Sequence, residues 1–207
     1  MLQLKDISIA HGAATPLFSG LSFSIAAGSM ALLQGPSGSG KSTLLAVISG
    51  TADRRVRHQG EILLDDVSLT ELPAEKRRVG IMFQDPLLFP HMSVADNLAF
   101  GLVAGKRHQR RQQVEEALGI AGLEGMAERD PATLSGGQAA RLALMRCLLA
   151  EPQALLMDEA FSALDPTLRR SFGGFVRDLI QHRQIPALLV SHDSGDADFA
   201  DGGIISL

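Results

Sequence analysis

Gly35-Pro36-Ser37-Gly38-Ser39-Gly40-Lys41-Ser42 is the stretch of sequence that decides the fold of this chain. It matches the pattern G-x-x-x-x-G-K-[ST] at every fixed position. An apolar run at residues 30–34 precedes it and predicts a buried strand, and residues 43–48 predict a helix. The glycines let backbone N–H groups turn toward phosphate oxygens, and the helix dipole favours negative charge there. The stretch therefore predicts a nucleoside triphosphate site, in which Lys41 reaches the β- and γ-phosphates and Ser42 binds Mg²⁺.

Composition limits the classes of protein to which the chain can belong. Its 207 residues suit one large domain, or one core with a smaller insert, and 45% apolar with 20% charged residues is typical of a globular protein. The net charge of −4 gives no support for a nucleic-acid partner, so we expect none. No apolar run approaches the ~18–20 residues that cross a bilayer, and Lys5 and Asp6 come too early for a signal peptide. The single cysteine, Cys147, excludes an internal disulfide and is expected in the core.

The first part of the chain predicts two kinds of sheet. Residues 2–9 and 21–25 alternate apolar and polar side chains, as half-exposed strands do. We therefore expect a small antiparallel sheet beside a parallel nucleotide-binding core. The basic run at residues 54–58 is expected to be a solvated loop, followed by strands at residues 61–64 and 79–83.

The middle of the chain has a helical texture. Apolar residues recur at helical spacing from Ser93, residues 106–118 form a charged amphipathic pattern, and residues 136–149 are again helical. This predicts a helical subdomain inserted at about residues 93–150. Buried strands are expected afterwards at residues 154–157, 185–190 and 203–207, with a helix at residues 167–181 between the first two.

Two acidic residues follow the strand at residues 154–157. Asp158 ends a buried strand, where a P-loop enzyme holds its Mg²⁺ directly or through water. Glu159 comes next and is a candidate for the group that activates or orients a water attacking the γ-phosphate.

A second anion site is predicted at Leu134-Ser135-Gly136-Gly137-Gln138, which opens the helix at residues 136–149. Ser135 is well placed as an N-cap, and the glycines leave the first helical N–H groups unobstructed. Paired glycines weaken a first turn by roughly 1 kcal/mol each relative to alanine, so their presence suggests that another group approaches the backbone closely.

The motifs of this chain resemble those of the ATP-binding-cassette (ABC) ATPases, over essentially the whole chain. They follow one another in the family's order: the phosphate loop at residues 35–42, residues 134–138, residues 155–159 and Ser162-Ala163-Leu164-Asp165. The resemblance implies an α/β fold of the P-loop NTPase class: an ABC-type core with a parallel sheet, an antiparallel β subdomain and the inserted helical subdomain, in one ATPase domain over residues 1–207. It also implies a head-to-tail homodimer with two ATP molecules between the protomers.

The resemblance assigns a role to each matching residue. One protomer would hold ATP through Gly35, Pro36, Ser37, Gly38, Ser39, Gly40, Lys41, Ser42 and Thr43, and its partner through Ser135, Gly136, Gly137 and Gln138. Gln84 resembles the glutamine that contacts Mg²⁺ or the attacking water and couples the ATPase to a membrane subunit. His192 resembles the histidine that contacts the γ-phosphate, and Asp165 the aspartate that reaches across the dimer. With Ser42, Gln84 and Asp158 as metal ligands, the expected cofactors are ATP and Mg²⁺.

The chain departs from the family pattern near His11, at Ala160, where many relatives have proline, and at Ala139, where a polar residue is common. Relatives usually carry an aromatic residue near His11 to stack on adenine, and this chain has neither Tyr nor Trp. His11 is therefore the candidate adenine contact.

Residues 82–94 are similar to the ATPase subunits of thiamine, sulfate, ferric iron or polyamine importers. We expect a short importer cassette without the regulatory domain of larger relatives, at the cytoplasmic face of the inner membrane, working with transmembrane permease subunits and a solute-binding protein. Leu87, Leu88 and Phe89 would either line the groove for a permease helix or pack inside the helical subdomain. Two alternatives remain open: the ATPase of an exporter or lipid-extraction system, and a soluble ABC protein that acts on DNA or ribosomes. A simple kinase or GTPase would not explain residues 134–138.

Overall fold

A five-stranded sheet forms the centre of the protein in the computed structural model, which describes residues 1–12 and 16–207. Its strands run parallel in the order β6-β7-β8-β3-β9. Because both faces of this sheet are covered, the three central strands are continuous apolar runs rather than alternating ones. The strands are β3 (Met30–Gln34), β6 (Val79–Phe83), β7 (Ala154–Asp158), β8 (Ala187–Val190) and β9 (Ile204–Ser206).

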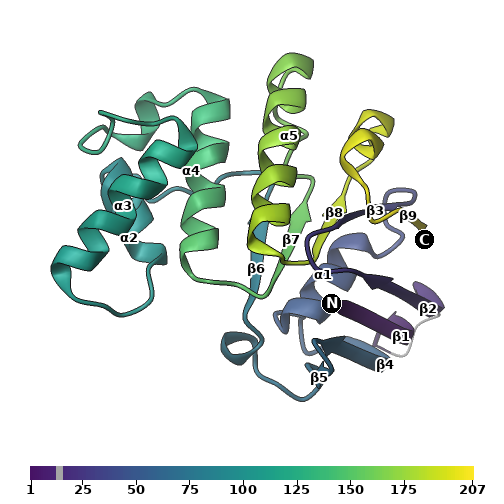
Figure 1. Cartoon of the computed structure of the whole chain (residues 1–207). Coiled ribbons are helices and arrows are strands. Elements are labelled where there is room, and N and C mark those ends of the chain that lie inside the picture. The colour runs from purple at the N-terminus through teal and green to yellow at the C-terminus, as the bar shows by residue number, and fades with distance from the viewer. Residues whose placement is uncertain (13–15) are drawn as a thin grey trace.

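A four-stranded antiparallel sheet lies beside the central sheet, in the order β2-β1-β4-β5 (Figure 1). Leu2 of β1 pairs with Ile25 of β2 on one side and with Leu64 of β4 on the other. The predicted combination of a parallel core and an antiparallel sheet is therefore confirmed. The strands are β1 (Leu2–His11), β2 (Phe18–Ile25), β4 (Val56–Leu64) and β5 (Val67–Ser68).

The prediction of a solvated loop at residues 54–58 is wrong for its second half. Val56 is paired with His11, Arg57 with Ala10 and His58 with Ile9, so that β4 extends through the basic run. The physical reason is strand alternation: Val56 packs against the core while Arg57 stays exposed. Charge alone does not exclude a strand with one solvated face.

Helices cover the two faces of the parallel sheet differently. Helix α1 (Lys41–Ser49) packs between the two sheets, in a core shared with Leu33, Leu156 and Val190. The next residues along the same strands, such as Leu32 and Met157, point to the opposite core. That core is formed with α2 (Val94–Gly101), α3 (Arg107–Ala121), α4 (Gly136–Leu149) and α5 (Pro166–Arg183) (Figure 1).

The predicted helical insert spans α2, α3, η2 (Pro131–Thr133) and α4, whose helices contact one another. Helix α4 also contacts β6 and α5, so this part shares one core with the sheet. The extent of the subdomain at about residues 93–150 stays a prediction. Two short 3₁₀ helices complete the chain, η1 (Ala74–Lys76) and η3 (Ser194–Phe199). Among the described residues, no helix is both long and apolar enough to cross a membrane.

Candidate functional site

The carboxyl-terminal edge of the parallel sheet collects most of the predicted site residues. Phe83, Asp158 and Val190 lie side by side in register on β6, β7 and β8, and Leu33 of β3 pairs with Val190. The loops that leave these strands therefore begin at one edge, where open α/β sheets bind their ligands.

The phosphate loop connects β3 to α1 in a conformation that requires glycine. Gly40 is the N-cap of α1 with φ of 100°, a left-handed backbone that other residues rarely adopt. A Cβ atom at Gly35 would lie 2.9 Å from Ser39 Oγ and 3.1 Å from the Leu207 carbonyl oxygen. The loop is thus closely packed at Gly35, where a side chain would clash.

The loop also directs one cation and one hydroxyl inward. Lys41 is buried, and its Nζ donates to the carbonyl oxygens of Gly35 at 2.7 Å and Pro36 at 2.9 Å. Ser39 Oγ is buried without a hydrogen-bond partner, which is unusual for a buried hydroxyl. A phosphate would accept from the Ser39 hydroxyl and would neutralise the charge of Lys41, so these residues fit the predicted triphosphate.

Few protein groups are available for a metal ion at this edge. Among the described residues, no cluster of three or more His, Cys, Asp or Glu side chains is suited to hold one. Mg²⁺ commonly takes one or two protein oxygens and completes its shell with phosphate and water. Ser42 on the exposed side of α1 and Asp158 at the end of β7 have the oxygen chemistry that such an ion needs, and their role as its ligands stays a prediction.

Glu159 and His192 come together although they are distant in sequence. Glu159 Oε1 lies 3.5 Å from His192 Nδ1, and both side chains are partly exposed. Glu159 has a φ of 50°, uncommon for a residue with a side chain, and its N–H donates to the Val190 carbonyl at 3.0 Å. The structure thus places a carboxylate and an imidazole together beside Asp158.

Ser162 is a supporting residue whose role was not predicted from the motif order. Its hydroxyl donates to the Glu159 carbonyl oxygen at 2.7 Å, and its backbone N–H donates to the same oxygen at 3.0 Å. These bonds hold the backbone of Glu159 in its left-handed conformation. The available signal was Ser162 itself, which opens the Ser-Ala-Leu-Asp motif.

The serine and glutamine of residues 134–138, which we call the signature, form a reciprocal cap at the start of α4. Ser135 Oγ accepts from the Gln138 N–H at 3.3 Å, and Gln138 Oε1 accepts from the Ser135 N–H at 2.9 Å. A Cβ atom at Gly136 would meet nothing within 4 Å, and at Gly137 only the ordinary contact with Leu168. The glycines are therefore not required by packing within this chain.

Three predicted residues have simpler surroundings. Asp165 is the N-cap of α5, where its Oδ1 accepts from the N–H groups of Thr167 and Leu168. Gln84 is exposed directly after β6, at the same edge as Asp158. His11 lies on the antiparallel sheet at the end of β1, exposed and beside Val56. The roles of these three residues stay predictions.

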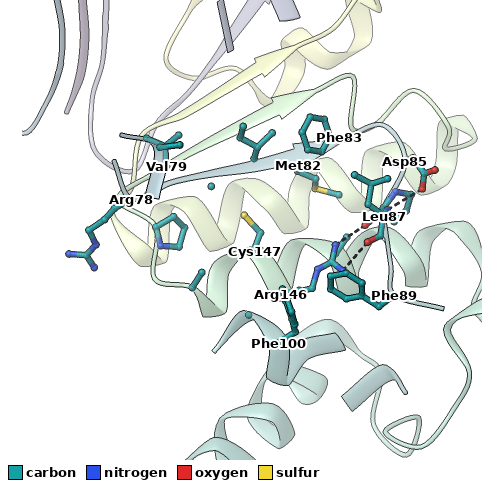
Figure 2. Close-up of a pocket in the computed structure, with 18 of the residues that line it drawn as sticks. Arg78, Val79, Met82, Phe83, Asp85, Leu87, Phe89, Phe100, Arg146 and Cys147 are labelled. Atoms are coloured by element: carbon teal, nitrogen blue, oxygen red, sulfur yellow. Dashed lines mark hydrogen bonds between the residues drawn. The ribbon is translucent and has the colours of Figure 1, made fainter. Parts of the chain in front are cut away.

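A groove with a volume of about 660 Å³ lies beside β6, an edge strand of the parallel sheet (Figure 2). Phe89 stacks against Phe100 with ring centroids 4.6 Å apart, and the Arg146 guanidinium lies 5.0 Å from the Phe89 centroid. Arg146 also donates to the carbonyl oxygens of Leu87 at 2.9 Å and Pro86 at 3.0 Å. Leu87 is exposed and Phe89 lines the groove, whereas Leu88 packs on the core; the groove as a site for a permease helix stays a prediction.

Cys147 lines the same groove. Burial raises the pKa of its thiol to about 11, so it is a neutral, unreactive group at physiological pH. This agrees with the expectation of a packing role.

Comparisons with known proteins identify this arrangement. The model of the family "ABC transporter" matches residues 18–162, and the chain belongs to that family. "Uncharacterized ABC transporter ATP-binding protein YnjD" of Escherichia coli (strain K12) is 42% identical over 100% of this chain and 95% of its own length. "Sulfate/thiosulfate import ATP-binding protein CysA" of Halalkalibacterium halodurans is 39% identical over 99% of this chain, which spans 58% of that relative.

A solved structure extends the comparison to the fold. The dimeric post-hydrolysis state of the ATP-binding cassette MJ0796, bound to ADP and Pi, superposes with a TM-score of 0.81. It is 28% identical, over 100% of this chain and 94% of that one. The expected ABC-type P-loop fold is confirmed, and the protein is an ATP-binding ABC ATPase of a transporter.

Proposed function

We propose that this protein is the ATPase subunit of a bacterial importer, powering solute uptake through separate transmembrane permease subunits. The observation that carries the proposal is a cluster of polar side chains along one sheet edge: Lys41, Asp158, Glu159 and His192. The chain also carries the signature at the start of a different helix, α4. The import direction is supported by the name of the sulfate/thiosulfate relative.

Within the site, each residue has a distinct task. Residues 35–43 bind the phosphates, with Lys41 supplying positive charge and Ser39 a hydroxyl donor. Ser42 and Asp158 hold Mg²⁺, which neutralises charge on the phosphates when it is bound, and Gln84 contacts that ion or the attacking water. Glu159 accepts a proton from the water or orients it, and His192 donates to the γ-phosphate. His11 takes the position against adenine.

We infer that two copies of the chain complete each other's sites head to tail. Helix α1, after the phosphate loop, and helix α4, after the signature, belong to cores on opposite faces of the sheet. A nucleotide on the phosphate loop of one protomer would receive Ser135, Gly136, Gly137 and Gln138 from the partner, with Asp165 at the same interface. The open space around Gly136 supports this, since nothing in its own chain requires a glycine there. The dimeric state of MJ0796 gives independent support.

The groove beside β6 is the proposed docking site for a cytoplasmic helix of the permease. It offers the exposed apolar side chains of Phe83, Leu87 and Phe100, which an apolar helix face would cover. Gln84 joins this groove to the nucleotide edge because it directly follows β6. The protein would then act at the cytoplasmic face of the inner membrane, with a solute-binding protein in the complete system.

The substitution Glu159→Gln tests the catalytic assignment. It keeps the size of the side chain and removes its ability to take a proton, so ATP turnover should fall on the order of a hundredfold or more. ATP affinity should be unchanged. A dimer should accumulate when ATP is added, and light scattering would detect it. Glu116→Gln, on the exposed face of α3, is the matched control. Wild-type turnover in Glu159→Gln would refute the assignment.

Purification of the native complex tests the import direction. Membrane subunits should co-purify with the wild-type chain, and Leu87→Asp should weaken their capture by placing a charge in the apolar groove. Addition of a solute-binding protein to the purified complex should stimulate its ATP turnover. A complex that transports its cargo outward would contradict import while leaving the ATPase assignment intact.

A further inference from the structure

Arg169 makes two ion pairs that neither the phosphate site nor the groove explains. It lies in the first turns of α5, and its guanidinium pairs through Nη1 with Asp193 and through Nε, at 3.3 Å, with Asp196. The Arg169 side chain is 16% exposed and that of Asp196 is fully buried. Ion pairs with this much burial have little screening by solvent, so they constrain geometry more than surface pairs do.

The two carboxylates that pair with Arg169 belong to the segment that carries His192. Asp193 follows His192 directly, its N–H donates to Ser191 Oγ at 3.0 Å, and its Oδ1 accepts from the Gly195 N–H at 2.8 Å. That backbone bond, followed by the Arg169 charge, holds the pKa of Asp193 below its ordinary value, so the carboxylate is charged at neutral pH. The backbone around His192 is thus anchored on one side by β8 and on the other by Arg169.

Asp196 depends on Arg169 more strongly. Burial raises the pKa of its carboxyl above the ordinary value, and a side-chain hydrogen bond with Ser191 and the charge of Arg169 counteract this effect. Both of its oxygens are buried, so Arg169, with the nearby Ser191 hydroxyl, compensates for their lost hydration. Close packing adds to this link, because a Cβ atom at Gly173 of α5 would lie 2.5 Å from the ring of Phe199 in η3.

Arg169 also stands close to the start of α5. Its backbone N–H donates to the carbonyl oxygen of Asp165, the N-cap residue, at 2.8 Å. One side chain therefore connects the first turn of α5 to the loop in which His192 lies 3.5 Å from Glu159.

We propose that Arg169 is a positioning residue for ATP hydrolysis, which holds the His192 loop in register with Glu159 and ties that loop to the start of α5. The inference rests on the proposed roles of Glu159, His192 and Asp165. Arg169 touches no nucleotide itself; its effect is exerted on the imidazole.

The first test separates turnover from binding. Arg169→Met keeps the apolar stem of the side chain and removes the two ion pairs. A displaced catalytic group of this kind lowers turnover by about tenfold to a hundredfold, whereas the affinity for ATP should stay within about twofold of wild type. Arg177→Met, at an exposed arginine later in α5, is the matched control and should leave both quantities unchanged. Equal turnover in the Arg169 variant and wild type would overturn the proposal.

A double-mutant cycle tests whether Arg169 acts through His192. In a His192→Ala background, Arg169→Met should lower turnover by less than about twofold, because the group that it positions is already absent. Full additivity of the two losses would overturn the proposal. Unchanged turnover in His192→Ala alone would instead refute the proposed function of His192, so the two failures are distinguishable.

Asp193→Asn covers the case in which Arg169→Met fails to fold. It weakens one ion pair at a partly exposed carboxylate and leaves the buried pair between Arg169 and Asp196 in place. Turnover should fall with unchanged ATP affinity and an unfolding temperature close to that of wild type. A variant with wild-type turnover would contradict the proposal.

Discussion

The two helix starts that are predicted to bind ATP are built in opposite ways. Helix α1 begins after Gly40, which has a left-handed backbone and no side chain to cap the first amides, and Lys41 lies over the loop. Helix α4 begins after Ser135, which caps the Gln138 amide and receives a reciprocal bond from that residue's side chain. The first start lacks a side-chain cap and gains most from an anion, whereas at the second the Gln138 amide is already capped, which leaves fewer amides for an anion.

This difference indicates that the two helix starts have different functions. The uncapped, lysine-bearing start is suited to capture nucleotide on its own, and the self-capped start is suited to add a few contacts once a phosphate is presented to it. We therefore expect changes at the phosphate loop to abolish ATP binding, and changes at the signature to abolish hydrolysis while binding persists.

Lys41→Ala should have the largest effect. Hydrogen bonds from a charged group are worth about 1.5–3 kcal/mol each, and Lys41 is expected to reach both the β- and γ-phosphates, so ATP affinity should fall by more than about a hundredfold, and turnover with it. Titration with a fluorescent nucleotide measures the affinity, and Lys5→Ala on the exposed face of β1 is the control. Unchanged affinity in Lys41→Ala would remove the basis for the comparison.

Gly136→Asp should lower turnover on the order of a hundredfold while ATP still binds to the single chain. An aspartate has open space here and is favourable at a helix N-terminus, so the fold is preserved, but its charge repels the phosphates of a partner-bound ATP. Gly174→Asp, at an open glycine of α5, is the control for the added charge. If Gly136→Asp turned over ATP at the wild-type rate, the signature would be only a helix cap.

Ser135→Ala should have the smallest effect on the fold, a modest loss of stability, beside the loss of turnover that we expect for changes at the signature. Loss of an N-cap serine costs about 1 kcal/mol, which corresponds to a decrease of about 2–4 °C in unfolding temperature for a domain of this size. Thermal unfolding followed by circular dichroism measures it. No decrease would mean that the cap observed at α4 contributes nothing, and the contrast with α1 would be weaker than described.

The sequence predicted local elements better than distant contacts. The strand at residues 30–34 and the helix at residues 136–149 match β3 and α4 because apolar periodicity and glycines bound them locally. The extension of β4 into the basic run was missed, since it depends on pairing with β1.

In the candidate site, too, single residues were predicted and the contacts between distant residues were not. Motif order and family resemblance pointed to Glu159 and His192 as separate residues, but their 3.5 Å approach depends on the register between β7 and β8. The link from Arg169 to Asp193 and Asp196 follows no local pattern. A contact between a helix and a distant loop becomes visible only in the folded chain.

The most direct test of two shared half-sites is complementation between two inactive variants. In a head-to-tail dimer of Glu159→Gln with Gly136→Asp, one site carries both defects and the other carries neither, so mixing should restore up to about a quarter of wild-type turnover. A chain with both substitutions should stay inactive alone, as should each single variant. No recovery on mixing, with mixed dimers present by mass spectrometry, would contradict the claim that each protomer completes its partner's site.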